Sequence, residues 1–180
     1  MSRMSPARPP YPAEIQQRLA RIMPEGMPPL ALFTTLARDP RLFERFMGAS
    51  LLDPGHLSLR QREIVIDRVT ALCGSDYEWG VHVALFAARA GLSDAEIHAL
   101  AKSGPDDPLW AADERLLIGV ADQLHRDCDI DDATWRELGR HFAEEAILEI
   151  LMLAGFYRMV SYLTNALRLP PELFARRLPA

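Results

Sequence analysis

The chain has 180 residues, 49% of them hydrophobic and 25% charged, and a formal net charge of −5. These values are typical of one folded domain and exclude a disordered chain. Its charges are scattered without a lysine- or arginine-rich block, which argues against a nucleic-acid-binding protein. Two cysteines cannot form a disulfide framework. We therefore expect a single cytoplasmic domain with free thiols.

The first twelve residues, MSRMSPARPPYP, contain four prolines and no apolar run. Proline fixes φ and lacks an N–H group, so regular structure is disfavoured here. The missing apolar run excludes a secretory signal peptide. We expect an arm over residues 1–12 that lies across the domain or a partner subunit, followed by one helical domain over residues 13–180.

Helical spacing of apolar residues recurs along the rest of the chain. No segment alternates between apolar and polar residues with the two-residue period of a β-strand. Asp39, Ser58 and Ser93 stand where helix N-caps are expected. Glu96, three residues after Ser93, completes a capping-box pattern. The pattern predicts a compact all-α domain of about seven helices, with ends uncertain by about 2–4 residues. The predicted ranges are 41–52, 59–73, 76–90, 94–102, 109–126, 131–140 and 143–167.

The most apolar stretch, AILEILMLAGFYRMVSYLTNAL, covers residues 146–167 and contains Glu149 and Arg158. Charged side chains inside such a stretch favour a buried amphipathic helix over a membrane span. No membrane partner is expected.

An acidic residue, Glu63, lies at the edge of the apolar stripe of the predicted helix 59–73. A buried carboxylate without a partner is strongly destabilising, or its pKa rises until the group is neutral. Two interpretations follow. Glu63 either pairs with a nearby arginine at the edge of the buried stripe, or it belongs to a functional site.

Ser75, Glu78 and His82 are spaced i, i+3 and i+7, so they share one face of the next helix. A glutamate one turn before a histidine can hold the imidazole ring or exchange a proton with it, as acid–base catalysis near neutral pH requires. The alternative is a surface pair that contributes only about a few tenths of a kcal/mol. Trp79 is expected on the neighbouring core-facing stripe and Tyr77 on the other side.

Neither cysteine has the surroundings of a nucleophile. Cys73 lies two residues before Ser75, about 200° around the helix, so it should face away from Glu78 and His82. An apolar cysteine without a base or a helix N-terminus is more often part of the core. Cys128, in RDCDIDD, is surrounded by acids that should raise the pKa of its thiol.

A metal site is not expected. Glu78 and His82, at i and i+4, supply at most two ligands, the HExxH pattern is absent, and the sequence offers no identifiable third ligand. We therefore predict neither a metal nor another cofactor.

Residues 58–102, which include REIVIDRVTALCGSDYEWGVHVALFAARAGLSDAEIHAL, resemble the carboxymuconolactone decarboxylase and AhpD-like alkylhydroperoxidase superfamily. Weaker similarity extends over LLIGVADQL at 116–124 and over residues 146–167. The resemblance implies a small AhpD-like helical unit, assembly into homo-oligomers and a small-molecule substrate.

The peroxidase branch of this superfamily is similar in carrying a glutamate, eleven residues, and then Cys-x-x-Cys-x-x-x-His. Counted from Glu63, these places are Ser75, Glu78 and His82, so both cysteines are replaced. The segment YEWGVH is similar to the signature of a subgroup that lacks the cysteine pair. Serine and glutamate cannot cycle through a disulfide, so the thiol mechanism of that branch does not transfer.

Three functions stay open. The resemblance implies an AhpD-like oxidoreductase with peroxidase activity, in which Glu63 and His82 remain as a proton relay. The second is a carboxymuconolactone decarboxylase-like acid–base lyase acting on a small carboxylated lactone, with an arginine holding the substrate carboxylate. The third is a non-catalytic helical oligomer that binds a small molecule. The candidate catalytic residues are Glu63, Glu78 and His82, and the candidate pocket residues are Ser75, Tyr77, Trp79 and Cys73.

Overall fold

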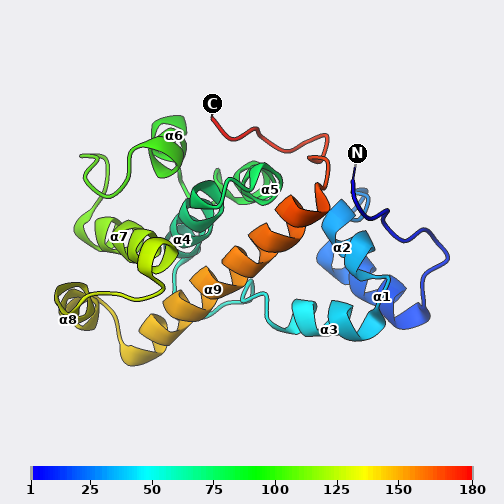
Figure 1. Cartoon of the computed structure of the whole chain (residues 1–180), viewed down its shortest axis with the longest axis horizontal. Coiled ribbons are helices and arrows are strands. Elements are labelled where there is room, and N and C mark those ends of the chain that lie inside the picture. The colour runs from blue at the N-terminus through cyan, green and yellow to red at the C-terminus, as the bar shows by residue number, and fades with distance from the viewer. Residues whose placement is uncertain (1, 180) are drawn as a thin grey trace.

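The computed structural model describes residues 2–179 and, within this range, consists of nine α-helices without a β-strand (Figure 1). The all-α prediction is confirmed, whereas the expected count of about seven is too low because two short N-terminal helices were not predicted. The helices are α1 (Ala13–Ile22), α2 (Ala31–Leu36), α3 (Pro40–Gly48), α4 (Leu59–Leu72), α5 (Asp76–Phe86), α6 (Asp94–Lys102), α7 (Ala112–Asp127), α8 (Asp132–His141) and α9 (Glu144–Leu167).

The two unpredicted helices differ in their periodic signal. Helix α1 has Ile15, Leu19 and Ile22 at i, i+4 and i+7, a helical pattern within one short segment, whereas α2 is only six residues long. A helix of six residues is shorter than two turns, so an apolar period cannot be read from it. Tertiary packing, rather than local sequence, stabilises such short helices.

The predicted N-caps are present. The carboxylate of Asp39 accepts a hydrogen bond from the backbone N–H of Leu42 at 3.0 Å. Ser58 and Ser93 each take part in a reciprocal capping box, with Gln61 and Glu96 respectively. These caps satisfy backbone N–H groups that have no partner inside the helix, and so they define where α3, α4 and α6 begin.

Helix α4 is the centre of the domain, since it packs against α5, α6, α7 and α9. Residues 63–70 of α4 are all buried, including three charged side chains. One of these, Arg68, donates to Asp122 of α7 at 2.6 Å and to the backbone carbonyl of Leu100 at 2.8 Å. The remaining two are acids, Glu63 and Asp67, and they belong to the candidate site described below.

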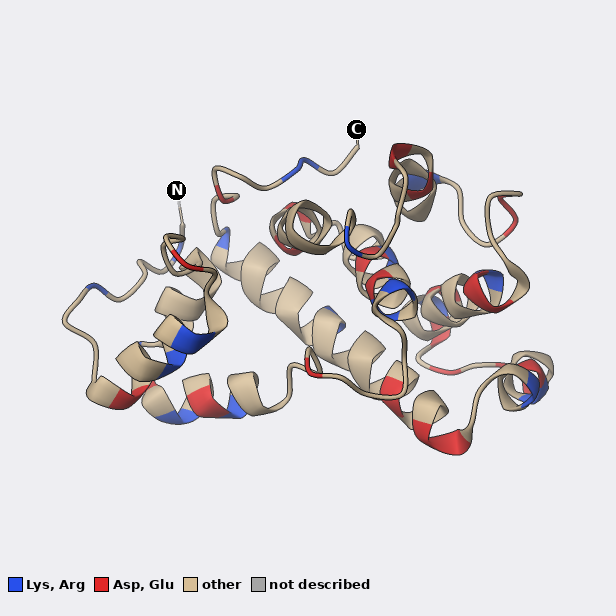
Figure 2. Cartoon of the chain, turned by 180° about the vertical axis from the view of Figure 1, so that it is seen from behind, with Lys and Arg blue, Asp and Glu red and all other residues tan. Residues whose placement is uncertain are grey.

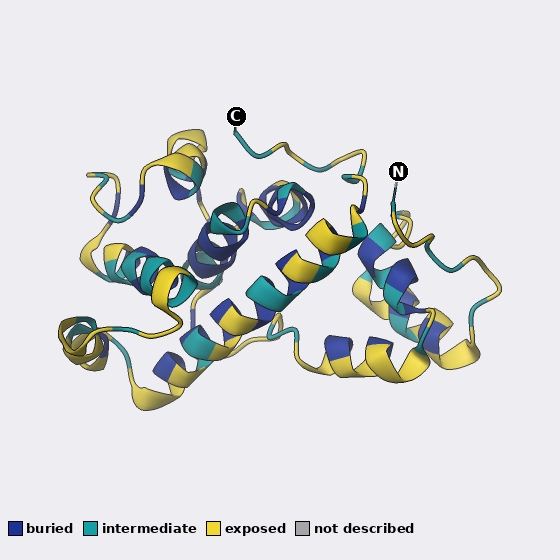
Figure 3. Cartoon of the chain, viewed as in Figure 1, coloured by how far each residue is buried: buried dark blue, intermediate teal, exposed yellow. Residues whose placement is uncertain are grey.

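Helix α9 runs along the domain from α8 to α2 and links the two ends of the molecule (Figure 1). It is the one helix in the described range that is long and apolar enough to cross a membrane, and 56% of its most apolar window is buried inside the fold. Its acidic residues gather near its N-terminal end (Figure 2). Buried and exposed positions alternate along it with a helical period (Figure 3). This is the pattern of a core helix with one outward face.

Both ends of the chain pack against the helices. In the N-terminal arm, the N–H of Arg3 donates to Leu167 and the N–H of Ala7 donates to Thr34. In the C-terminal tail, the N–H of Arg176 donates to the carbonyl of Gly80 at 3.2 Å. The tail therefore lies over α5, the helix that carries His82.

Candidate functional site

The contact between α4 and α5 buries an acid and a histidine against each other. Nδ1 of His82 lies 2.8 Å from Oε2 of Glu63, and the two residues are 3% and 0% exposed. The other oxygen of Glu63 accepts a hydrogen bond from Nε of Arg62 at 3.2 Å. Glu63 therefore pairs with an arginine and also with the histidine.

A second carboxylate approaches the other side of the ring. Oε1 of Glu78 lies 3.5 Å from Nε2 of His82, and Glu78 is 6% exposed. Oε2 of Glu78 is buried and has no hydrogen-bond partner within residues 2–179. A surface Glu–His pair is excluded, because both side chains lie in the interior.

The carboxylates control the protonation of His82. Burial lowers the pKa of the imidazole, but the charge and hydrogen bond of Glu63, together with those of Glu78, outweigh it and raise the pKa to about 10. At neutral pH the ring is therefore an imidazolium that donates from Nδ1 to Glu63. Its Nε2–H group then lies next to Oε1 of Glu78, on a residue pair that lines the cavity described below.

Another buried acid, Asp67, lies one turn after Glu63 on α4. It is 1% exposed, and neither of its carboxylate oxygens has a hydrogen-bond partner in the part of the chain that the structure describes. Burial, and then the charge of Glu63, raise the pKa of Asp67 well above its ordinary value. Sequence reasoning missed this residue, although its place inside the apolar run IVIDRV carries the same signal that identified Glu63.

A cavity of about 330 Å³ opens beside Glu78 and His82. Its walls are otherwise almost entirely apolar and aromatic, and Ser50 and Tyr157 are the remaining polar side chains among the residues that line it. The walls come from the end of α1, from α2 and α3, and from α5 and α9. Sequence reasoning found the polar end of this cavity but not Tyr157 or the N-terminal wall.

The four candidate pocket residues do not line this cavity. Ser75 is the N-cap of α5, and its hydroxyl lies 2.8 Å from that of Thr164 on α9. The ring of His82 meets Tyr157 on the same helix, so Ser75 and His82 both face α9, but only His82 lines the cavity.

Tyr77 and Trp79 are buried structural residues. The hydroxyl of Tyr77 donates to Glu172 in the C-terminal tail and accepts from the N–H of Leu32, so it joins the tail, α5 and α2. Trp79 is 1% exposed and belongs to the core, on the side predicted for it.

The thiols lie away from the cavity. Sγ of Cys73 lies 3.8 Å from Nδ1 of His125, and burial raises the pKa of its thiol. Burial also lowers the pKa of His125, which keeps this ring neutral near pH 7. Cys128 is exposed at the end of α7. Within residues 2–179, no group of three or more metal-ligating side chains is arranged to hold a metal ion.

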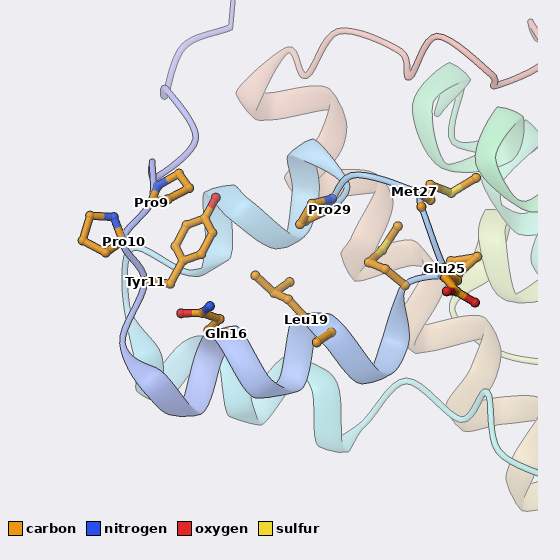
Figure 4. Close-up of a pocket in the computed structure, with 12 residues that line it drawn as sticks. Pro9, Pro10, Tyr11, Gln16, Leu19, Glu25, Met27 and Pro29 are labelled. Atoms are coloured by element: carbon orange, nitrogen blue, oxygen red, sulfur yellow. The ribbon is translucent and has the colours of Figure 1, made fainter.

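A larger depression of about 730 Å³ lies between the N-terminal arm and α1 (Figure 4). Pro9, Pro10 and Tyr11 face Leu19 and Pro29 across it (Figure 4). Its lining contains neither histidine nor cysteine, and one carboxylate, Glu25. It therefore offers no acid–base pair comparable to Glu78 and His82.

Part of the sequence and the fold are similar to those of known proteins. Residues 40–117 match the sequence profile described as the Carboxymuconolactone decarboxylase family. An uncharacterised peroxidase-related protein from Silicibacter sp. TM1040 has the same fold, with 20% identity, a TM-score of 0.84 and coverage of 96% of this chain and 92% of that chain. No curated protein matches the sequence.

Two further solved structures share the fold. A peroxidase-related protein from Ralstonia eutropha JMP134, described as an alkylhydroperoxidase AhpD core, is 19% identical over 96% of this chain and 93% of that chain, with a TM-score of 0.81. The debrominase Bmp8 is 17% identical over 95% of this chain and 92% of that chain, with a TM-score of 0.72.

Proposed function

We propose that this chain is an acid–base enzyme for a small, uncharged, apolar substrate. Its residues 40–117 match the profile of the Carboxymuconolactone decarboxylase family, and its fold is shared with an AhpD core structure. The observation that carries the proposal is the position of His82, between Glu63 and Glu78, at the wall of the cavity. Titratable groups of shifted pKa that converge on a cavity are typical of catalytic sites.

Each residue has a distinct role. The imidazolium of His82 gives a proton to the substrate, Glu78 removes a proton from it, and Glu63 fixes the ring and its tautomer through Nδ1. After the substrate leaves, the proton on Glu78 returns to His82 across the 3.5 Å between them. The cycle thus restores both groups without an external oxidant or reductant. Positioned proton transfer of this kind accelerates reactions by about 10²–10⁴-fold.

An uncharged substrate fits better than the carboxylated lactone considered from the sequence. The lining of the cavity contains no lysine or arginine among its described residues, so nothing there is placed to hold a substrate carboxylate. Arg62 is already engaged by Glu63 and by the carbonyl of Leu52. An anionic substrate would also meet the carboxylate of Glu78.

A second candidate is an AhpD-like peroxidase that uses Cys73 as a single reactive thiol. The contact between Cys73 and His125 favours it, because a neutral histidine can accept the thiol proton. The raised pKa of Cys73 and its separation from the cavity weigh against it.

The test measures deuterium incorporation by NMR after incubation in D₂O with a panel of small uncharged ketones, enones and lactones. The wild-type chain should catalyse the replacement of substrate protons by deuterium in at least one of these classes of compound. His82→Gln should reduce the rate of this exchange by about 10²–10⁴-fold. Cys73→Ser is the matched control and should leave the rate unchanged. The proposal fails if the wild type is silent with the whole panel, and hydroperoxide consumption that is lost in Cys73→Ser would establish the second candidate.

A further inference from the structure

Arg62 on α4 joins the Glu63–His82 pair to the wall of the cavity, although it does not line the cavity itself. Its Nε–H donates to Oε1 of Glu63 at 3.2 Å, while Oε2 of the same carboxylate faces His82. Its Nη1 donates to the backbone carbonyl of Leu52 at 2.9 Å. The side chain is 11% exposed, so these contacts are largely shielded from water. Because the N–H donors of a guanidinium lie in one rigid plane, Arg62 holds two acceptors in a fixed arrangement.

The same guanidinium also lies over an aromatic ring of the cavity wall. Cζ of Arg62 is 5.8 Å from the ring centroid of Phe86, which lines the cavity and lies 5.1 Å from the ring of His82, centroid to centroid. A cation over an aromatic face is attracted to it, and more strongly where water is excluded. Arg89 makes a similar contact with Phe86, at 5.9 Å, but is exposed. Of the two arginines, Arg62 is the one that also pairs with Glu63.

The wall segment that Arg62 holds contains a backbone conformation that needs support. Leu51 has a φ of 51°, in the left-handed region that residues with a Cβ rarely adopt. It precedes Leu52, which lines the cavity and is 37% exposed. Such a conformation persists where the surrounding structure fixes the neighbouring backbone. The hydrogen bond from Arg62 to the carbonyl of Leu52 therefore sets the position of a solvent-facing part of the wall.

Arg62 also acts on the charge of Glu63. The charged and titratable side chains around the His82 ring come from three helices: Arg62, Glu63 and Asp67 on α4, Glu78 on α5, and Tyr157 on α9. The part of the lining that comes from residues 22–52 contains no charged side chain. Arg62 therefore competes with the imidazolium for the negative charge of Glu63. Without Arg62, this charge would act on His82 alone, and the ring would release its proton less readily.

We propose that Arg62 is a positioning residue of this site: it fixes Oε1 of Glu63 so that Oε2 meets His82, and it keeps Leu52 and Phe86 at a set distance from the reacting groups. By sharing the charge of Glu63, it also leaves His82 a better proton donor. The proposal rests on the acid–base function proposed for the same cavity, but the effect of Arg62 on His82 is measurable without a substrate.

The first measurement is the ¹H NMR signal of the Nδ1–H group of His82 in a chain labelled with ¹⁵N-histidine. Arg62→Gln should move this signal downfield, because the hydrogen bond to Glu63 strengthens when the carboxylate loses its other cation. Arg62→Lys restores the charge and should return the signal toward its wild-type position. Arg89→Gln, which removes a cation from the same ring of Phe86, is the matched control and should leave the signal unchanged.

The second measurement separates kcat from KM in the deuterium-exchange assay, with a compound that the wild type accepts. Arg62→Gln should lower kcat and raise KM, so that kcat/KM falls by about 10-fold or more. Arg62→Lys should raise KM and keep kcat close to that of the wild type, because one ammonium group keeps the charge but cannot span Glu63 and Leu52. Constants equal to those of the wild type in both variants would overturn the proposal.

The NMR signal can overturn the proposal in two ways: the same position in the wild type and in Arg62→Gln, or an equal shift in Arg89→Gln. If Arg62→Gln does not fold, the wild-type chain decides. The Nε–H of Arg62 should then exchange with water more slowly than that of Arg89, and equal rates would overturn the proposal.

The two proposals can fail separately. A wild type that exchanges no compound of the panel would refute the acid–base function, and the His82 signal would still decide the influence of Arg62. Deuterium exchange that is lost in His82→Gln, together with an unchanged His82 signal in Arg62→Gln, would support the acid–base function and reject the positioning role.

Discussion

Nδ1 of His82 lies 2.8 Å from Oε2 of Glu63 in a contact between α4 and α5 from which water is excluded. This pairing raises the affinity of His82 for a proton. In water, an imidazole is mostly neutral above pH 6.5, but here Glu63 holds the proton on the ring. The remaining predictions follow from this relationship and from the packing that surrounds it.

The first prediction concerns the charge of His82. The pKa raised to about 10 means that the ring stays an imidazolium at pH 7–8, and Glu63→Gln should lower this pKa because the main attraction is lost while burial remains. Two-dimensional ¹H–¹⁵N NMR of the imidazole nitrogens reports the protonation state directly. Exposed His98 serves as an internal control. A His82 signal that titrates near pH 6.5 in the wild type would contradict the prediction.

The second prediction concerns Asp67. Its pKa in the folded state is raised above the ordinary value of 3.8, so its contribution to stability is fully present below about pH 4 and is lost as the pH rises through the folded-state pKa. Asp67→Asn cannot ionise and avoids this loss. The free energy of unfolding of Asp67→Asn minus that of the wild type should therefore grow from pH 4 to pH 8. At pH 8 it should exceed roughly 0.5 kcal/mol, the usual size of the effect of a surface substitution.

Urea unfolding at each pH measures this difference. Asp106→Asn, at an exposed position in the loop before α7, is the control for replacing an aspartate at the surface. A difference that stays constant between pH 4 and pH 8 would show that Asp67 has the same protonation in the folded and unfolded states.

The third prediction concerns Gly80. A Cβ at this position would lie 2.1 Å from the carbonyl oxygen of Arg176, so Gly80→Ala should displace the C-terminal tail from α5. Within a helix, glycine to alanine is otherwise stabilising by about 0.5–1 kcal/mol. Gly119→Ala on α7 has nothing within 4 Å of its Cβ and should show this ordinary gain. The temperature of thermal unfolding should therefore change in opposite directions in the two variants, and only Gly80→Ala should make the tail more sensitive to limited proteolysis.

The fourth prediction concerns self-association. The outward face of α9 carries a nonpolar stripe with alternating steps of four and three residues (Figure 3): Leu148, Met152, Gly155, Met159, Tyr162 and Ala166. This is the spacing of a coiled-coil seam. We propose that two copies of the chain pair along it. Light scattering after size-exclusion chromatography should give a homo-oligomer, and Met152→Glu should dissociate it. Leu42→Glu on α3 is the control, and a monomeric wild type would contradict the proposal.

The sequence predicted local features well. The caps at Asp39, Ser58 and Ser93 bond residues only three positions further along the chain. The apolar period of a helix can likewise be read from a single segment of the sequence. The pairing of Glu63 with His82 was suggested by their fixed spacing in a resembling family, and the structure brings both residues to one buried contact. Helices α1 and α2 were missed because their stability depends on packing partners far away in the chain.

The sequence by itself determined the helical class, the main helix starts and the acid–base residue types of the site. Only the tertiary structure decided that Ser75 lies against Thr164, that Asp67 is buried, and that Glu78 and His82 line a largely apolar and aromatic cavity. The physical reason is distance along the chain. Helix caps and apolar periods depend on residues that are close in the sequence. The cavity wall instead brings together rings such as Phe46 and Phe156, which come into contact only when the whole domain packs.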